Sequence, residues 1–508
     1  LFFPEGFIIF VSNTAIWNAM PDTFLLFALI DLKPYLSFGY IVFVIITIAV
    51  SIHDKRDPVE ALSWIIVISL LPVVGFIFYI VFGRNYRKQK LFSRKELSDL
   101  EQIDTLSRQQ IYEINNAAVL HKPEISDNRD IITLLLNSNK ALLTVHNRVK
   151  LLNDGTETFD EIRKALWSAS SSIHLEYYII EDDPLGREIA DILIAKAQQG
   201  VEVRLIYDDV GSWGLGRKYI GRLRKAGVRV ECFMQVVFPW LTSHVNYRNH
   251  RKILVVDGKI GFTGGINIAQ RYVTGTKMGP WRDTHLRLEG EAVGMLQIVF
   301  IADWFFVSKQ LLNDYPKYLP KTHVKEETMI QIATSGPDSD WASIMQAFFS
   351  AITHAQHHIY ISSPYFLPNE AILTAVKVAA LSGIDVRIMI PSRSDSKVVY
   401  WASRSYIGEL IDANVKVYLY RRGFNHSKLI MIDGQFSSVG TANMDIRSFE
   451  DNFEVSALLY DRKITQELEA EFLHDLDQSR MVTRDYWESR PALHSFYEAL
   501  SRLFSPLL

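Results

Sequence analysis

One segment of this chain occurs twice and decides its fold. Residues 250–257 read HRKILVVD and residues 426–433 read HSKLIMID, so both copies match the pattern His-x-Lys-x-x-x-x-Asp. The match extends further, because each copy is followed after six residues by a similar ending, GGIN at 264–267 and GTAN at 440–443. A three-residue pattern arises by accident now and then, but two copies with matching flanks do not. The repeat indicates two equivalent half-sites that share one site.

Each His stands two residues before its Lys, so in an extended strand both side chains project to the same side. We expect both pairs to face a common cleft. The pairs are His250 with Lys252 and His426 with Lys428. The apolar run after each Lys predicts a buried strand that ends at an Asp-Gly dipeptide, which suits a tight hairpin turn. Asp257 and Asp433 are therefore expected to be structural.

This arrangement resembles the phospholipase D superfamily, in which two such motifs meet at a pseudo-twofold axis. The resemblance implies that His250 attacks phosphorus and that His426 acts as general acid and then as general base, although the two motifs themselves leave that order open. It also implies that both motif lysines hold the non-bridging phosphate oxygens, where they provide the charge that a metal provides elsewhere. The family's Gly-Ser-x-Asn extension is altered here, since Gly265 and Thr441 replace serine.

Four further residues are expected to support the site. Asn267 and Asn443 would donate hydrogen bonds as charge builds on the phosphate oxygens. A nucleophilic imidazole needs a carboxylate on its other nitrogen to fix the tautomer. The resemblance implies Glu454 as the acidic partner of the second histidine, and Asp283 is the candidate for the first. The alternative for either acid is a surface position or a salt bridge with Arg282 or Arg447.

Composition restricts the class of protein. The 508 residues are 48% hydrophobic and have a mean hydropathy of +0.06, which is apolar for a soluble protein and indicates contact with lipid. The net charge of −3 provides no general cationic field for nucleic acid. The single cysteine, Cys232, excludes an internal disulfide and fits a reducing cytosolic setting. A zinc site is the rival use of the histidines, but there is no tight His/Cys cluster, so we expect neither metal nor cofactor.

Two apolar runs near the N-terminus, 36–52 and 61–82, are separated by the polar stretch HDKRDP at 53–58. About 20 apolar residues span a bilayer, so the runs predict a transmembrane hairpin, with a buried globular hairpin as the alternative. Basic residues cluster at 84–90 and place the C-terminal side in the cytoplasm by the positive-inside rule. Residues 1–34 are either another membrane element or the remnant of a longer start.

The hairpin is similar to the membrane anchor of bacterial cardiolipin synthases of the phospholipase D type. The shared strings continue along the chain: RDP at 56–58, LPVVG at 71–75, GRN at 83–85, LEYYI at 175–179, YDDVGS at 207–212, SPYF at 363–366 and SPLL at 505–508. The resemblance implies a multi-pass protein of the bacterial cell membrane that acts on phosphatidylglycerol with its catalytic domains on the cytoplasmic side. The oligomeric state stays open.

Strands and helices alternate in the same order in both halves. We expect strand 173–179, helix 187–198 and strand 201–207, then strand 359–361, helix 370–381 and strand 384–390. This predicts two α/β domains, each a mixed sheet flanked by helices, related by pseudo-twofold symmetry and preceded by the transmembrane helical hairpin. The expected division is an uncertain segment 1–34, hairpin 35–83, juxtamembrane linker 84–128, first domain 129–320, second domain 321–488 and amphipathic tail 489–508.

The implied reaction transfers a phosphatidyl group from one phosphatidylglycerol to another and gives cardiolipin and glycerol. An apolar mouth would favour a lipid alcohol over water, and the candidates are VVFPWL at 236–241 and the tail. For the first, a core strand with a turn is the alternative; the second either lies in the membrane interface or docks on the domain. The rival functions are a phospholipase D hydrolase, a phosphatidylserine synthase, a nuclease of the same superfamily and a non-catalytic scaffold.

Overall fold

The computed structural model describes residues 58–71, 98–115, 123–236 and 247–505, with isolated residues between 38 and 79. These fall in two compact units, residues 1–85 and 86–508. In the first unit the structure describes helix α3 (Pro58–Leu70). Residues 1–34, most of the predicted span 36–52, the end of the span 61–82 and most of the segment 236–241 lie outside the described residues. The transmembrane hairpin therefore stays a prediction.

The second unit contains two large β-sheets and a small two-stranded one. The first has the strand order β14-β8-β7-β6-β3-β4-β5, and β2 also pairs with β8. Its strands are β2 (Asn147–Asp154), β3 (Ser172–Tyr177), β4 (Glu202–Asp208), β5 (Arg229–Phe233), β6 (Lys252–Val256), β7 (Ile260–Gly264), β8 (Trp281–Gly290) and β14 (Phe424–Asn425). The second has the order β1-β9-β18-β16-β15-β10-β12-β13-β19. Its strands are β1 (Leu143–Thr144), β9 (Met329–Ser335), β10 (His358–Ser362), β12 (Asp385–Pro391), β13 (Lys416–Tyr420), β15 (Leu429–Ile432), β16 (Phe436–Gly440), β18 (Glu454–Tyr460) and β19 (Ser479–Met481).

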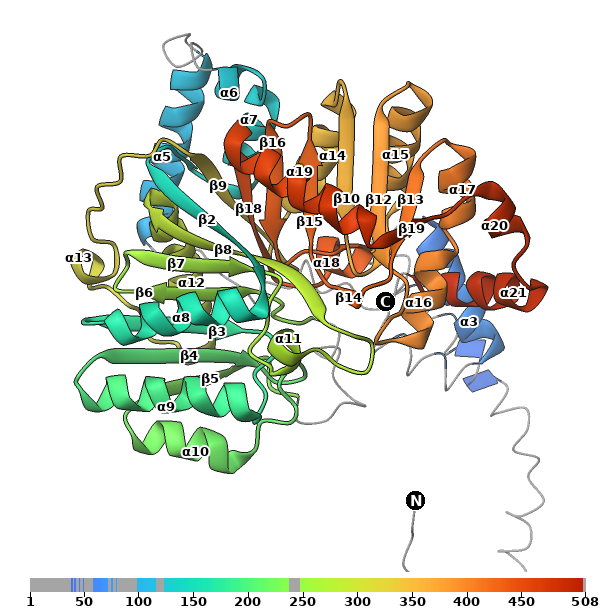
Figure 1. The fold of residues 1–508 in the computed structure, drawn as a ribbon. Helices are drawn as coiled ribbons and strands as arrows, with labels where there is room; N and C mark the ends of the chain where they lie inside the picture. The colour runs from blue at the N-terminus through green and yellow to red at the C-terminus, as the bar shows by residue number, and fades with distance from the viewer. Residues whose placement is uncertain are drawn as a thin grey trace, which may run out of the picture. The chain divides into compact units, whose positions relative to one another are not determined.

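The two sheets repeat one topology. The order β2-β8-β7-β6-β3-β4-β5 in the first corresponds strand for strand to β9-β18-β16-β15-β10-β12-β13 in the second. In both, three strands pair in parallel, β3, β4 and β5 in the first and β10, β12 and β13 in the second. The motif strand, β6 or β15, joins them antiparallel. Figure 1 shows the green sheet of the first half and the orange-to-red sheet of the second half meeting near β14. The predicted α/β fold with two similar halves is confirmed.

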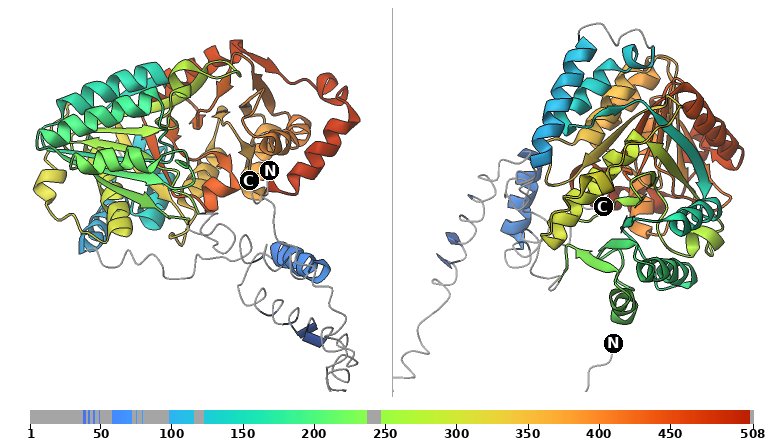
Figure 2. Two further views of the ribbon diagram at one scale, coloured as in Figure 1. Left: turned by 90° about the horizontal axis from the view of Figure 1, so that it is seen from below. Right: turned by 90° about the vertical axis from the view of Figure 1, so that its left-hand side faces the viewer.

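Helices cover both sheets (Figures 1 and 2). Those of the first half are α8 (Gly155–Ser168), α9 (Pro184–Gln198), α10 (Arg217–Lys225), α11 (Arg271–Thr274) and α12 (Glu291–Ser308), followed by α13 (Tyr315–Tyr318). Those of the second half are α14 (Ser343–His354), α15 (Glu370–Leu381), α16 (Lys397–Arg404), α17 (Ile407–Asp412), α18 (Ile446–Glu450), α19 (Arg462–Asp477), α20 (Arg484–Glu488) and α21 (Ala492–Arg502). A two-stranded sheet joins β11 (Phe366–Leu367) to β17 (Met444–Asp445).

Helix α12 is one of the core helices. Among the described residues it alone is long and apolar enough to cross a membrane. Its side chains Leu296, Phe300 and Trp304 are at most 1% exposed. Leu296 packs among strands of both sheets, and Phe300 and Trp304 pack against β4 and β5 of the first. Apolar surface covered in this way contributes about 25 cal/mol per Å² removed from water. The helix is therefore part of the protein core, because 44% of its residues are buried against other elements.

The N-terminal part of the predicted first domain belongs to the second half. Helix α7 (Arg129–Asn139) packs into the core that includes β9, β10 and α14, and β1 pairs with β9. Helices α5 (Ser98–Asn115) and α6 (Pro123–Ser126), which lie in the predicted linker, add Ile114 and Ile125 to the same core. Residues 129–144 were assigned to the first domain because they precede it in the sequence. In the structure they pack on the sheet of the second half, and only then does the chain enter the first half.

Candidate active site

The two motif strands end in identical turns. Asp257 and Asp433 both have positive φ, 53° and 54°, and each is followed by a glycine with φ of 64°, as a type I′ turn requires. The Asp257 carboxylate accepts hydrogen bonds from the backbone of Ser171 and Ser172 at 2.7 and 2.8 Å, and the Asp433 carboxylate accepts three from residues 356–358. Both aspartates thus fasten the motif strand to the start of its neighbour, and we assign them this structural role.

Each motif histidine pairs with an acid of the other half. His250 Nδ1 lies 3.0 Å from both carboxylate oxygens of Glu454, and His426 Nδ1 lies 2.7 Å from Asp283 Oδ2. The expected assignment, Glu454 to the second histidine and Asp283 to the first, is therefore wrong. The acids were identified correctly, but the two pairs are crossed.

Backbone pairing between the halves explains the crossing. The amide of His250 donates to the carbonyl of Phe453 at 2.9 Å, next to Glu454. By the same geometry the amide of His426 donates to the carbonyl of Arg282 at 2.7 Å, next to Asp283, and β14 pairs in parallel with the start of β8. Each motif thus runs beside the acid-bearing strand of the opposite half, which is a tertiary contact that local sequence does not encode.

The motif lysines lie on the same side as their histidines, as the alternation predicts. Lys252 Nζ donates to the carbonyl of His250 at 2.6 Å, and Lys428 Nζ lies 2.8 Å from His426 Nδ1. Burial lowers the pKa of Lys252 to about 7 and that of Lys428 to about 8. An anionic phosphate nearby would favour the charged form and offset this effect of burial.

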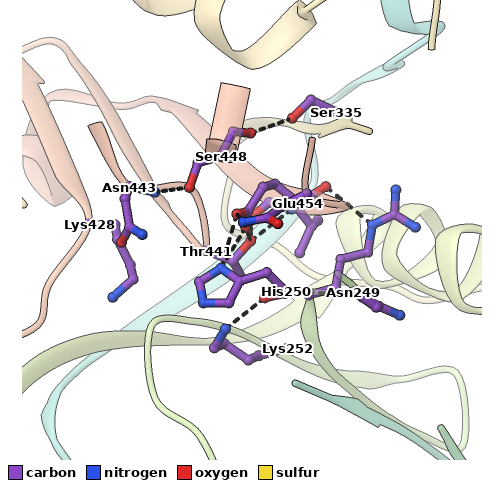
Figure 3. Close-up of polar contacts among 12 residues, drawn as sticks. Asn249, His250, Lys252, Ser335, Lys428, Thr441, Asn443, Ser448 and Glu454 are labelled. Carbon is purple, nitrogen blue, oxygen red and sulfur yellow. Dashed lines mark hydrogen bonds and ion pairs between the residues drawn. The ribbon is translucent and has the colours of Figure 1, made fainter. Parts of the chain in front are cut away.

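The environments of the two histidines differ. A carboxylate only accepts hydrogen bonds, so Glu454 holds the proton on His250 Nδ1 and leaves Nε2 with a free lone pair (Figure 3). His426 Nδ1 instead meets a carboxylate and an ammonium group, Asp283 and Lys428, so its neighbours do not fix the position of its proton. Burial lowers the pKa of His250 to about 4 and that of His426 well below its ordinary value.

The two acids differ as well. Burial raises the pKa of Asp283 to about 6 although Lys428 opposes the shift. Burial also acts to raise the pKa of Glu454, but the His250 partner and the hydroxyl hydrogen bond from Thr441 outweigh it, so this pKa is lowered. At neutral pH Glu454 is therefore ionised, whereas the pKa of Asp283 lies much closer to neutral pH.

The altered glycine-serine positions lie beside these acids. Thr441 donates its hydroxyl hydrogen to Glu454, and Figure 3 shows the two together above the His250 ring. At Gly265 a Cβ atom would collide with the carboxylate of Asp283. The missing side chain therefore leaves the space that the shorter acid occupies. Asn267 and Asn443 both line the cavity in front of the histidines, as expected from their equivalent places in the repeat.

A cavity of about 360 Å³ joins the two half-sites, which is within the range of small-molecule pockets. Its lining includes His250, His426, Asn267, Asn443, Tyr178, Tyr272, Trp281, Tyr365, Arg248, Arg271 and Arg447. Arg271 and Arg447 each stand four residues after the motif asparagine, so they are equivalent residues of the repeat. The sequence analysis did not identify Arg271, and it considered Arg447 only as a salt-bridge partner. Extending the alignment of the two motifs by four positions reveals both.

Asparagines before the motif histidines were also missed. Asn249 Oδ1 accepts from the amide of Arg251 at 3.1 Å, and Asn425 Oδ1 accepts from the amide of Ser427 at 3.0 Å. Each asparagine therefore braces the backbone around its histidine. The repeated dipeptide Asn-His was the available signal.

The arrangement suits in-line displacement at a phosphodiester. Two imidazoles face one cavity, three arginines line it, a lysine lies beside each histidine, and each histidine has an acid behind it. One imidazole can attack phosphorus while the other protonates the leaving oxygen.

Comparison with known proteins agrees with this site. The family model described as "Cardiolipin synthase, PLD-like domain" matches residues 162–277 and 348–476, and the phospholipase D-nuclease N-terminal model matches residues 40–84. A cardiolipin synthase of Geobacillus sp. strain WCH70 is 44% identical over 459 residues, 90% of each chain. One of Alkalihalophilus pseudofirmus is 42% identical over 95% of this chain and 98% of its own.

A further relative and a solved structure extend the comparison. The major cardiolipin synthase of Bacillus subtilis is 40% identical over 93% of this chain and 98% of its own. The crystal structure of a phosphatidylserine synthase from Haemophilus influenzae superposes with a TM-score of 0.55 over 75% of this chain and all of that chain, at 13% identity, and so shares the fold. The chain therefore belongs to the family of cardiolipin synthases with phospholipase D-like domains.

Proposed function

We propose that the protein transfers a phosphatidyl group from one phosphatidylglycerol to the terminal hydroxyl of another and so forms cardiolipin and glycerol. The observation that carries the proposal is the cavity with two imidazoles, each held by an acid of the opposite half. The names of its relatives supply the lipid. The proposed catalytic set is His250, Lys252, His426 and Lys428, with Asn267, Asn443, Asp283 and Glu454 in support and Asp257 and Asp433 as structural parts of the motifs.

In the first step His250 Nε2 attacks phosphorus and a nitrogen–phosphorus bond forms. The bond to glycerol oxygen breaks as His426, which the anionic phosphodiester keeps protonated in the substrate complex, gives its proton to that oxygen. Lys252, Lys428 and the two asparagines stabilise the charge on the non-bridging oxygens. In the second step His426 takes the proton from the terminal hydroxyl of the acceptor. The new oxygen attacks phosphorus, and the electron pair of the nitrogen–phosphorus bond returns to His250.

The order of the histidines rests on the difference between their acids. A nucleophile needs one tautomer and a stable counter-charge once it becomes cationic, and the ionised Glu454 supplies both to His250. A general acid and base must gain and lose a proton within one cycle. His426 fits that role, since its Nδ1 lies between Asp283 and Lys428 and the pKa of Asp283 is about 6.

The test is incubation of the purified, detergent-solubilised protein with labelled phosphatidylglycerol, followed by separation of the lipid products. Cardiolipin with an equal amount of glycerol is the expected result. Phosphatidic acid as the sole product would make the protein a hydrolase. Turnover only when serine and a different phospholipid donor are supplied would make it a phosphatidylserine synthase.

We also propose that the chain is an integral protein of the bacterial cell membrane, anchored through 36–52 and 61–82 with the catalytic halves on the cytoplasmic side. The match of residues 40–84 to the N-terminal family model supports this. The domain boundary near residue 320 is retained as a proposal, since it falls between α12 and β9. Protease accessibility in inside-out vesicles tests the topology, because cleavage of the catalytic part is expected only there.

The tail docks on the second half and keeps an apolar face exposed. In α21, the rings of His494 and Tyr497 lie tilted against Trp401 of α16, a helix whose Val399 lines the cavity. On the outside of α21 and in the two residues after it, the side chains Leu493, Phe496, Leu500, Leu503 and Phe504 are 44–75% exposed. We propose that this face touches the bilayer surface beside the cavity. Replacing Leu493 and Leu500 by serine should slow turnover of phosphatidylglycerol in vesicles but not of a short-chain form dissolved as monomers.

A further inference from the structure

Transfer to a lipid alcohol requires a way to prefer that alcohol over water. Phosphatidylglycerol differs from water and from free glycerol in carrying a phosphodiester three carbons from its terminal hydroxyl. A cation placed beside the acceptor side of the cavity would recognise this second phosphate. The equivalent arginines Arg271 and Arg447 are the candidates, because both line the cavity.

The two arginines lie toward different histidines. The Arg271 guanidinium stacks over Trp281 with its centre 5.3 Å from the ring centroid, and the Trp281 ring lies 5.6 Å from His426. Burial raises the pKa of Tyr178 and the charge of Arg447 opposes this shift, so the two residues of the cavity lining lie near each other. The Tyr178 ring lies 4.9 Å from His250. Arg271 therefore belongs to the His426 side of the cavity and Arg447 to the His250 side.

Arg271 also has an unused donor. Its Nη1 pairs with Glu181, but its Nε is buried and finds no hydrogen-bond partner among the residues that the structure describes. A buried donor without an acceptor is costly, and a phosphodiester oxygen would satisfy it. Glu181 and the stacked Trp281 hold the guanidinium in one orientation, so it is prepared for such a ligand.

We propose that Arg271 binds the phosphodiester of the acceptor phosphatidylglycerol and thereby selects a lipid acceptor in the second step. The inference rests on the proposed function and on His426 as the base. When His426 removes the proton of the terminal hydroxyl, the acceptor phosphate lies on the Arg271 side of the cavity. The hydroxyl oxygen then forms its bond to the phosphorus held on His250, and the nitrogen–phosphorus bond breaks. Water and glycerol cannot use Arg271 in this way, since they carry no phosphate.

The test compares two reactions of the same full-length enzyme in detergent. One is cardiolipin formation from phosphatidylglycerol, and the other is exchange of labelled free glycerol into phosphatidylglycerol, which needs both histidines but no acceptor phosphate. For Arg271→Gln we expect the ratio of cardiolipin formation to glycerol exchange to fall roughly tenfold to hundredfold, the size of one lost charged hydrogen bond. The KM for the acceptor should rise, and phosphatidic acid should form a larger share of the product.

Two matched variants complete the test. Glu181→Gln removes the charge of the ion-pair partner but keeps an oxygen that accepts from Arg271 Nη1, so the cation keeps its orientation and the ratio should stay close to that of the wild type. Arg447→Gln should lower both reactions together, because that arginine lies on the side of the donor phosphate. The proposal is overturned if Arg271→Gln lowers both reactions equally, if Glu181→Gln reproduces its effect, or if Arg447→Gln is the selective variant. A wild-type enzyme that exchanges glycerol but makes no cardiolipin would instead refute the proposed function.

Discussion

The first and second halves of the molecule share a strand order but surround their histidines differently. His426 lies within 6.4 Å of four aromatic rings, those of Tyr272, Trp281, Tyr365 and Phe424, whereas one such ring, that of Tyr178, is recorded beside His250 among the described residues. Behind them, Gly265 with Asp283 in one half corresponds to Thr441 with Glu454 in the other. The comparison shows that a symmetric scaffold can hold two chemically distinct imidazoles.

The largest effect is expected from the histidines themselves. Alanine at His250 or at His426 should lower cardiolipin formation by about a thousandfold or more, since each removes one required group. A phosphatidyl donor with an acidic nitrophenol leaving group needs no general acid. With this donor the His426→Ala variant should release one equivalent of nitrophenol in a burst, and the His250→Ala variant should release none. The reverse result would exchange the two roles.

The next effect concerns a buried cation that only the first half possesses. Arg251 is fully buried, pairs with Asp303 and donates through Nε to the carbonyl of Glu454 at 3.2 Å, whereas the equivalent residue of the second half is Ser427. Arg251→Ser would leave Asp303 buried without its partner, so we expect a loss of about 3–5 kcal/mol of stability. Thermal unfolding in detergent measures it.

Ser427→Ala is the matched control for that change. The Ser427 hydroxyl has no hydrogen-bond partner among the residues that the structure describes, so its removal should cost little. Equal losses in the two variants would show that the Arg251 contacts do not hold the halves together.

A third effect follows from the space beside the acids. Gly265→Ser would push Asp283 away from His426, and a displacement of about 1 Å at a catalytic group can lower the rate roughly a hundredfold. Thr441→Ser keeps the hydroxyl that donates to Glu454, so its kcat/KM should stay near the wild-type value. If Gly265→Ser were as active as Thr441→Ser, Asp283 would not need its present position.

The smallest effect is a difference in pH dependence. Burial lowers the pKa of His285 in β8 from 6.5 to about 3, and the equivalent residue in β18 is Ser456. Between these values the unfolded chain binds a proton that the folded chain does not, so stability falls as pH falls, by at most about 1.4 kcal/mol per pH unit. His285→Ser should therefore reduce the drop in melting temperature on acidification below pH 6.5. An unchanged dependence of the melting temperature on pH in the His285→Ser variant would contradict the lowered pKa of His285.

Sequence reasoning succeeded where the information was local. The spacing of His and Lys predicted one shared face, and the Asp-Gly dipeptides predicted the tight turns after β6 and β15. The predicted strands and helices agree with the structure to within a few residues, because apolar periodicity and glycine positions determine them. The repeat then extended these local findings to the whole scaffold.

Sequence reasoning failed where the halves meet. Pairing of the start of β8 with β14 decides which acid reaches which histidine, and no property of Asp283 or Glu454 encodes that contact. The same holds for β1, which joins the distant strand β9. Arg251 was overlooked for another reason, since a cation between two motif residues looks like an exposed charge until its partner Asp303 is seen.

The crossed acids carry a consequence for the ancestry of such a chain. A single-copy ancestor with the same pairing would have been inactive as a monomer, because its histidine would need the acid of a second copy. It would have been active only as a twofold dimer, and every mutation would have changed both subunits in the same way. Within one chain the two copies can change independently, so one half can carry Asp283 beside Gly265 while the other carries Glu454 beside Thr441. Identical subunits would surround both histidines in the same way, so two histidines with different chemical roles require two copies that differ in sequence.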